Sequence, residues 1–369
     1  NPSDTLVALD SLTYAGNRDN LAAAMGEPWF TFIEGSINDQ ALVERLLRDH
    51  AIDTLVHFAA ESHVDRSITG PDAFIDTNIV GTHSLLKAAK NCWLDDDSTR
   101  NNLFHHVSTD EVYGTLLATD PAFSETTPYA PNSPYAASKA ASDHLVRAYH
   151  HTFGLRVTTS NCSNNYGPFQ FPEKLLPLCM LNILGGKALP IYGDGSQIRD
   201  WLFVDDHNRG IERVIKAGRA GETYNIGGHN EWRNLDVVTL LCELFDTRFA
   251  ADPTLAIRFP DSPCAVGQSA KSLGIKGDEV FAITGVMALN NGHVPKEVTV
   301  TAGDITFTTK VRIIKIKAAY IKAEIWMPSA SPNWLASNEA IVLPGANRDK
   351  LKLRELPIII VTAMVSPMA

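Results

Sequence analysis

The sequence lacks the features of a secreted, membrane-spanning or nucleic-acid-binding protein. Its 369 residues include only five cysteines, with no Cys-x-x-Cys spacing, so we expect free thiols in a reducing compartment and no metal site. No apolar run reaches the roughly 18 residues of a membrane helix, and the polar start, Asn1 to Asp4, does not resemble a signal peptide. The net charge of −10 disfavours nucleic acid and anionic membranes as partners. These absences predict a cytoplasmic protein.

The composition is that of an ordinary globular protein, with 44% hydrophobic and 20% charged residues. At about 150 residues per domain, the length predicts two or three domains. We expect a nucleotide-binding domain over residues 1–165 and a smaller ligand-binding region, rich in Pro, Gly and aromatic residues, over 166–273. The tail over 274–369 resembles nothing familiar, and we interpret it as a fusion or frameshift. Its alternating stretch over 297–317 predicts β-hairpins.

Apolar strands alternate with amphipathic helices through the first part of the chain. Strands are predicted over 6–10, 30–34, 54–60, 103–107 and 156–160, and helices over 39–50, 72–90 and 133–151. This alternation predicts an α/β fold with a Rossmann-like, doubly wound parallel sheet. Ligands of such sheets bind at the carboxyl ends of the strands, so the residues that follow each strand are the informative ones.

Tyr135 and Lys139 form a Tyr-x-x-x-Lys pair inside the helix predicted over 133–151. The spacing of four residues places both on one helix face. A nearby ammonium group favours the phenolate and lowers the pKa of the phenol, so that it can act as a base near neutrality. The pair alone is also compatible with chance on a solvated helix.

Two acids, Asp110 and Glu111, follow the strand predicted over 103–107, within Ser108–Gly114. Neighbouring carboxyl groups can take different pKa values, so that one acts as an acid and the other as a base. A solvated turn is the alternative. At two other strand ends, small Ala59 and Ala60 would let a ligand approach the backbone, and Asp10 could accept the hydroxyls of an adenosine ribose. A turn or helix cap is the alternative for Asp10.

These motifs occur together and in one order over roughly residues 4–272. They comprise Asp10–Asn17, His57–Arg66, Thr77–Thr82, Ser108–Gly114, Tyr135–Lys139, Asn161–Gly167, Pro190–Tyr192, Arg199–Trp201 and Tyr224–His229. The set resembles the extended short-chain dehydrogenase/reductase family, and more narrowly its dTDP-glucose 4,6-dehydratase branch. Epimerases of the superfamily share the Tyr-x-x-x-Lys pair but not the Thr-Asp-Glu run at Thr109–Glu111.

The resemblance implies an NAD-dependent hydro-lyase of deoxysugar (rhamnose-type) biosynthesis. Tyr135, assisted by Lys139, takes the proton of the sugar 4-hydroxyl while hydride passes from C4 to NAD, and Thr109 binds the 4-oxygen. Glu111 then removes the C5 proton and Asp110 protonates the departing 6-hydroxyl, before hydride returns to C6. A homodimer is implied as well.

The resemblance also implies the binding residues. Those expected to contact NAD are Asp10, Ser11, Thr13, Ser36, Ile37, Phe58, Ala59, Ala60, Ser62, Thr77, Ser108, Tyr135, Lys139 and Asn165. Those expected to contact dTDP-glucose are Ser62, Thr109, Asn164, Lys174, Leu175, Pro190, Tyr192, Arg199 and Asn234. Lys174 and Arg199 suit a diphosphate by charge alone, although a surface salt bridge is the alternative for each.

The chain departs from the family pattern at both ends. The family opens with a strand and a glycine-rich loop that holds the NAD pyrophosphate, whereas this sequence begins at Asn1 with what corresponds to the second strand. The family's Arg-Pro-Gly-His-Asp segment is replaced after Leu273, and Ser36 stands where an acid is usual. We therefore expect the chain as given to bind NAD weakly. The alternatives are a GDP-mannose dehydratase, a UDP-sugar epimerase, or an inactive binding or assembly protein.

Overall fold

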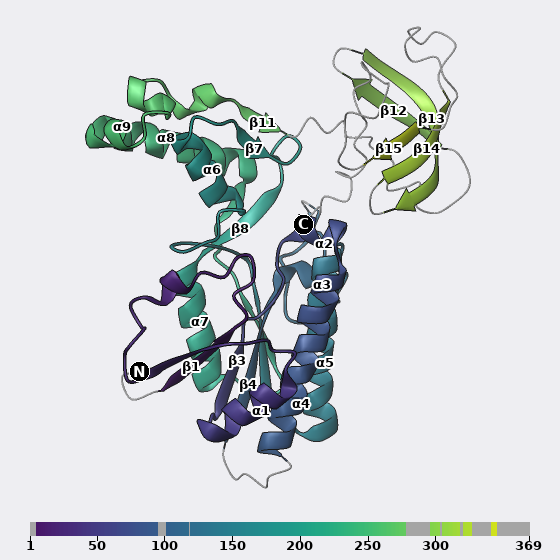
Figure 1. The fold of residues 1–369 in the computed structure, drawn as a ribbon. Coiled ribbons are helices and arrows are strands. Elements are labelled where there is room, and N and C mark those ends of the chain that lie inside the picture. The colour runs from purple at the N-terminus through teal and green to yellow at the C-terminus, as the bar shows by residue number, and fades with distance from the viewer. Residues whose placement is uncertain are drawn as a thin grey trace.

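Parallel strands form the centre of the molecule. In this computed structural model, described for residues 5–94, 101–117, 119–277 and four later strands, one sheet has the order β3 (Thr54–His57), β4 (Leu103–Thr109), β5 (Val157–Cys162), β9 (Thr223–Ile226). A separate parallel pair joins β1 (Leu6–Asp10) to β2 (Phe30–Glu34). Figure 1 shows the strands with helices on both faces. The predicted α/β fold with a Rossmann-like parallel sheet is confirmed.

Three helices pack on one face of the sheet, namely α1 (Gln40–Asp49), α4 (Thr82–Trp93) and α5 (Pro134–Phe153), whereas α7 (Val204–Ala217) lies on the other (Figure 1). Local sequence fixes the ends of α5. The Ser133 hydroxyl accepts the Ala136 N–H at 3.0 Å, Pro134 occupies the first helical position, and Gly154 ends the helix in a left-handed conformation. The predicted helix over 133–151 is therefore confirmed.

The prediction of one continuous helix over 72–90 is wrong in detail. It divides into α3 (Asp72–Phe74), a π-helical segment (Ile75–Gly81) and α4. The carbonyl of Asn78 accepts hydrogen bonds from the hydroxyls of Thr82 and Ser142, each at 2.5 Å, and this local side-chain pairing accompanies the wider turn. The strand predicted over 54–60 ends at His57, and α2 (Val64–Thr69) was not predicted.

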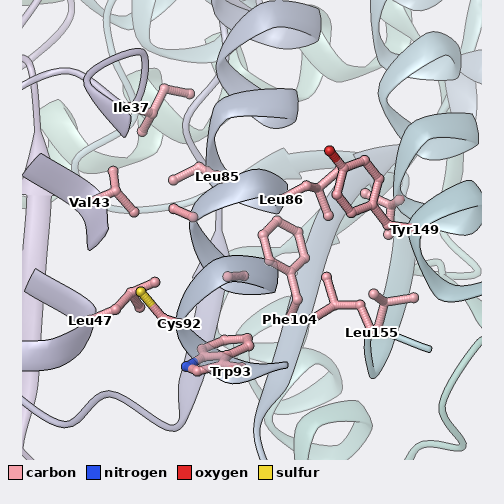
Figure 2. Close-up of a cluster of buried hydrophobic side chains, with 14 residues drawn as sticks. Ile37, Val43, Leu47, Leu85, Leu86, Cys92, Trp93, Phe104, Tyr149 and Leu155 are labelled. Atoms are coloured by element: carbon pink, nitrogen blue, oxygen red, sulfur yellow. The ribbon is translucent and has the colours of Figure 1, made fainter. Parts of the chain in front are cut away.

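The main core lies between β4 and the helices on its face, as Figure 2 shows. Phe104 of β4 is fully buried among side chains from α4 and α5. The other labelled members are Ile37, Val43, Leu47, Leu85, Leu86, Cys92, Trp93, Tyr149 and Leu155. Every residue of β4 is buried, so its polar side chains must find partners inside the protein.

A second core lies among α6 (Leu175–Leu184), α8 (Asn234–Ala251) and β7 (Leu189–Ile191), which pairs with β11 (Ile275–Gly277). The other elements of this part of the chain are β6 (Asn164–Tyr166), β8 (Ile198–Phe203), β10 (Glu231–Arg233) and α9 (Thr254–Arg258), with 3-10 turns at Pro263–Val266 and Ala270–Leu273. Two further 3-10 turns lie earlier in the chain, at Arg18–Leu21 after β1 and at Asp110–Tyr113 after β4. Because β9 returns to the first sheet, we propose that the units expected over 1–165 and 166–273 are interleaved.

The tail contains an antiparallel sheet of β12 (Lys296–Ala302), β13 (Ile305–Lys317), β14 (Tyr320–Trp326) and β15 (Ile341–Pro344). Strands β12 and β13 pair from Lys296 opposite Val311 to Ala302 opposite Ile305. The β-hairpin predicted over 297–317 is thus confirmed. Residues 278–295, 303–304, 318–319, 327–340 and 345–369 of the tail lie outside the described residues.

Replacing Phe104→Ala should lower the free energy of unfolding by about 3–5 kcal/mol, because it removes a buried ring and leaves a cavity beneath α4 and α5. Urea denaturation followed by circular dichroism measures the change. Phe169→Ala is the matched control, since that ring is 75% exposed, and it should change the value by less than about 0.5 kcal/mol. Equal losses in the two variants would contradict this account of the core.

Candidate active site

The end of β4 positions the two predicted acids. The Thr109 hydroxyl accepts the Glu111 N–H at 3.3 Å and lies 3.4 Å from an Asp110 carboxylate oxygen, so it fixes the turn that carries both acids. Gly114 closes this turn at a φ of 96°, and a Cβ there would collide with the carbonyl oxygen of Ala130. A side chain at Gly114 would therefore displace the turn.

Burial raises the pKa of both acids. The pKa of Asp110 is raised to about 7 by desolvation and then by the charge of Glu111, while Arg199 acts in the opposite direction. The pKa of Glu111 is also raised by desolvation, and the positive charges of Arg199 and Lys174 oppose this rise. At neutral pH, Asp110 is therefore about half protonated. One acid holding a proton beside another is the arrangement that paired acid–base catalysis requires.

Tyr135 and Lys139 lie on the buried face of α5, with exposed fractions of 8% and 4%. Burial and the charges of Glu111 and Asp110 raise the pKa of Tyr135 well above 10, although a hydrogen bond with Thr109 lowers it. The expectation that Lys139 lowers this pKa is therefore wrong, because desolvation and the neighbouring acids raise it. The Lys139 amine instead donates to the Val107 carbonyl at 2.8 Å. The charges of Glu111 and Asp110 act on Tyr135, so these three side chains lie within electrostatic reach of one another.

The ends of β1, β2 and β3 carry the side chains expected at a cofactor. The Gly35 N–H donates to the Asp10 carbonyl at 3.0 Å, which places Ser36 and Ile37 beside the end of β1. The exposed Asp10 carboxylate accepts the Leu12 N–H at 2.7 Å, and Thr13 and Ser11 are exposed in the same turn. After β3, Phe58 is 56% exposed and Ala59 and Ala60 are partly exposed.

Hydrogen bonds connect the segments that follow β1 and β3 to residues between 173 and 192. The Lys174 amine donates to the Ser62 carbonyl at 3.1 Å, and the Tyr192 hydroxyl donates to Asp65 of α2. The Tyr14 hydroxyl donates to Glu173 at 2.9 Å. Predicted cofactor-side and ligand-side residues therefore meet at Ser62 and Lys174.

Other predicted residues have contacts away from the acid pair. Asn234, at the start of α8, donates its N–H to the Gln197 carbonyl at 2.9 Å, and Pro190 lies in β7 beside Cys179. The Asn165 carboxamide oxygen pairs with the His207 ring at 2.8 Å. Asn164 lies in β6, Leu175 opens α6, and Thr77 is partly buried in the π-helical segment. Their roles remain predictions.

Sequence reasoning missed Asp143, a buried acid on α5 that is 5% exposed. Ser108, the Tyr129 hydroxyl and the His106 ring all pair with its carboxylate, at 3.0, 2.9 and 3.0 Å. The available signal was its spacing. Asp143 follows Lys139 by the same four residues that separate Lys139 from Tyr135, so all three side chains share a helix face.

The described residues contain neither a metal-binding cluster nor a membrane-spanning helix. No group of three or more His, Cys, Asp or Glu side chains there is arranged to hold a metal ion. In the same part of the chain, no helix combines the length and apolar character needed to cross a membrane.

Comparison with known proteins gives extensive similarity to nucleotide-sugar dehydratases. A family model described as GDP-mannose 4,6 dehydratase matches residues 3–253. A dTDP-glucose 4,6-dehydratase of Escherichia coli is 57% identical over 256 residues, which cover 67% of this chain and 71% of the relative. A dTDP-glucose 4,6-dehydratase of Xanthomonas campestris is 60% identical over 243 residues, covering 65% and 69%.

Solved structures agree with the sequence relatives. A dTDP-glucose 4,6-dehydratase of Streptomyces venezuelae, with NAD and TYD bound, superposes with a TM-score of 0.62 at 50% identity and covers 66% of this chain and 72% of that one. A UDP-glucuronic acid 4-epimerase of Bacillus cereus, with UDP-glucuronic acid and NAD, has a TM-score of 0.59 at 31% identity, covering 66% and 76%. The dehydratase resemblance is the stronger of the two.

Replacing Asp110→Asn should stabilise the protein by about 1–3 kcal/mol more at pH 8 than at pH 5. The pKa of Asp110, about 7 in the fold, lies above that of an unfolded Asp, so the folded state binds the proton more tightly and stability falls as pH rises through this interval. The asparagine carries no charge at either pH. Thermal unfolding at the two pH values measures the difference.

Asp206→Asn is the control, because Asp206 is exposed on α7 and paired with Arg209. It should shift the melting temperature little at either pH. A stabilisation of Asp110→Asn that is equal at pH 5 and pH 8 would show that charge burial is not its cause.

Proposed function

Because the chain belongs to the dTDP-glucose 4,6-dehydratase family, we propose that it is an NAD-dependent hydro-lyase that converts dTDP-glucose to dTDP-4-keto-6-deoxyglucose. The observation that carries this proposal is the pair of acids after β4, which interacts with Tyr135 on α5. An epimerase needs a base at C4 but no acid–base pair for the loss of water. The product serves deoxysugar biosynthesis of the rhamnose type.

The residues at the strand ends suit NAD. Asp10 offers a free carboxylate to the adenosine ribose, and partly exposed Ala59 and Ala60 leave the backbone after β3 open to a ligand. Tyr135 and Lys139 would face the other half of the cofactor. Ser11, Thr13, Ser36, Ile37, Phe58, Ser62, Thr77, Ser108 and Asn165 are proposed as further contacts. When bound, NAD supplies the acceptor for hydride from C4 and the donor that returns it to C6.

The chain's own residues move the protons. Tyr135 takes the proton of the 4-hydroxyl, and Thr109, hydrogen-bonded to Tyr135, binds the 4-oxygen. The resulting ketone acidifies the C5 proton, which Glu111 removes. Asp110 holds a proton near neutral pH and delivers it to the departing 6-hydroxyl.

Positive groups near the acids suit the diphosphate of the substrate. Arg199 of β8 and Lys174 at the start of α6 act on Glu111 through their charges. A guanidinium and an ammonium are the usual protein ligands of phosphate oxygens. Ser62, Asn164, Leu175, Pro190, Tyr192 and Asn234 complete the proposed substrate contacts.

The double variant Asp110→Asn with Glu111→Gln should separate oxidation from elimination. Without the two acids, water loss should stop, while Tyr135 still allows oxidation at C4, so NADH accumulates and no 6-deoxy product forms. The measurement combines nicotinamide absorbance with product analysis by mass spectrometry, in NAD-saturated protein given dTDP-glucose. An isothermal titration first establishes the NAD concentration required.

Tyr135→Phe is the companion variant, since it should abolish NADH formation as well and lower turnover by about 10²–10⁴-fold. Asp205→Asn with Asp206→Asn, an adjacent pair of exposed acids on α7, is the matched control and should retain full turnover. Full dehydratase turnover in the Asp110–Glu111 variant would refute the assignment. Turnover of UDP-sugars or GDP-mannose in preference to dTDP-glucose would favour the rival enzymes.

We propose further that the protein is a cytoplasmic homodimer. All five cysteines lie in the described residues and none forms a disulfide, as expected in a reducing compartment. The π-helical segment exposes Ile75 and Val80, at 45% and 48%, beside α4 and α5. Exposed apolar side chains on an otherwise regular helical face support a contact with a second copy.

Val80→Glu should shift the protein from dimer to monomer, because a charge at the centre of an apolar contact is costly to bury. Size-exclusion chromatography with light scattering measures the mass. Ile257→Glu, at an 81% exposed position on α9, is the control and should leave the mass unchanged. A dimer that survives Val80→Glu would place the interface elsewhere.

A further inference from the structure

Lys139 is a charged group with almost no access to solvent. Its side chain is 4% exposed, and its amine donates to the Val107 carbonyl, which is polar but uncharged. Burial lowers the pKa of Lys139, and the negative charge of Asp143 raises it. A buried ammonium needs an opposite charge to remain protonated. Asp143, one helical turn later on the same face of α5 and 5% exposed, supplies that charge.

The surroundings of Asp143 suit a carboxylate. The hydroxyls of Ser108 and Tyr129 both donate to one oxygen, at 3.0 and 2.9 Å, and the His106 ring pairs with the other at 3.0 Å. Three donors converge on this side chain, two from β4 and one from the loop before α5, whereas a protonated acid would itself need an acceptor. Burial raises the pKa of Asp143 to about 6, which leaves it mostly ionised at neutral pH.

The neighbouring titratable groups are neutral. Burial and the charge of Lys139 lower the pKa of both His57 and His106 well below 6.5. The Thr82 hydroxyl donates to the Asn78 carbonyl, so it accepts from the His57 ring at 2.8 Å. Cys162 of β5 is a thiol, because burial raises its pKa to about 12.

Two further titratable groups complete the surroundings. His144, next to Asp143 on α5, is exposed, and it is the last of the influences that lower the pKa of Asp143. The charge of Asp143 contributes to the raised pKa of Tyr113. Within the described residues around the inner end of α5, Lys139 and Asp143 are therefore the opposite charges that compensate each other.

We propose that Asp143 is a positioning residue for the reaction, the counter-ion that keeps Lys139 protonated and bound at Val107 while Tyr135 transfers its proton. Its effect on turnover rests on the proposed function, whereas its effect on Lys139 is a property of the protein alone.

The first test measures Lys139 directly. Protein carrying ¹³C-labelled lysine side chains is titrated by NMR, and the Lys139 signal is assigned by its loss in Lys139→Met. Asp143→Asn should lower the pKa of Lys139 by about 1–3 units, since an opposite charge nearby shifts a pKa by that amount. Tyr129→Phe is the matched control, because it removes a hydrogen bond to the same carboxylate without removing the charge. The pKa of Lys139 should shift much less in Tyr129→Phe than in Asp143→Asn.

The second test uses turnover. In the wild type, the alkaline limb of the kcat–pH profile should report loss of the Lys139 proton, and Asp143→Asn should move this limb to lower pH. Asp143→Glu, which keeps the charge, should restore much of the wild-type position of this alkaline limb. A loss of kcat at every pH with an unmoved limb and an unmoved Lys139 pKa would reduce Asp143 to a packing residue and overturn the proposal.

These readouts separate the two proposals. A wild-type protein that fails to convert dTDP-glucose would refute the function, while the NMR titration still decides the role of Asp143. If Asp143→Asn does not fold, combining it with Lys139→Met should restore folding, because the second change removes the uncompensated charge. Failure of the combined variant to fold as well would contradict charge compensation.

Discussion

The hydrogen bond from the Lys139 amine to the Val107 carbonyl joins the buried face of α5 to the end of β4. It fixes the rotation of α5, because turning the helix would leave the ammonium, and Asp143 one turn later, without partners in a water-free interior. With that rotation set, Tyr135 lies beside the turn that carries Asp110 and Glu111. The geometry of the site therefore depends on where the buried Lys139 ammonium can form its hydrogen bond.

Desolvation also dominates the pKa values of the ionisable side chains in the site. It is the largest influence on the pKa of Asp110, Glu111, Tyr135 and Lys139, and in each case it favours the uncharged form. Burying these ionisable groups costs stability, so stability alone does not explain their presence at these positions. The proposed acid–base catalysis accounts for their presence, because an Asp110 that keeps its proton into the neutral pH range suits that role at the expense of stability.

Strong local patterns made most of this architecture predictable. The strands ending at Asp10 and Glu34 and the long helix α5 follow from apolar runs and caps. The acid pair stands out because it follows the buried strand β4, and Tyr135 because it lies four residues before Lys139 on α5. The π-helical turn at Asn78 was not predictable, because hydroxyls 4 and 64 residues away bond its carbonyl. Asp143 was missed for a similar reason, since its donors come from residues 14 to 37 positions away.

The raised pKa of Tyr135 appears at first to oppose its role as a base, but the acids beside it resolve this. Two of the influences that raise it are the charges of Glu111 and Asp110, so each proton taken up by an acid makes the phenol easier to ionise. Asp110 accepts its proton near neutral pH. In the proposed mechanism, a proton on the acid that later protonates the departing 6-hydroxyl therefore also removes a charge that holds the proton on Tyr135. By the same electrostatics, the protonation state proposed for elimination is the one in which the proposed oxidation at C4 can begin.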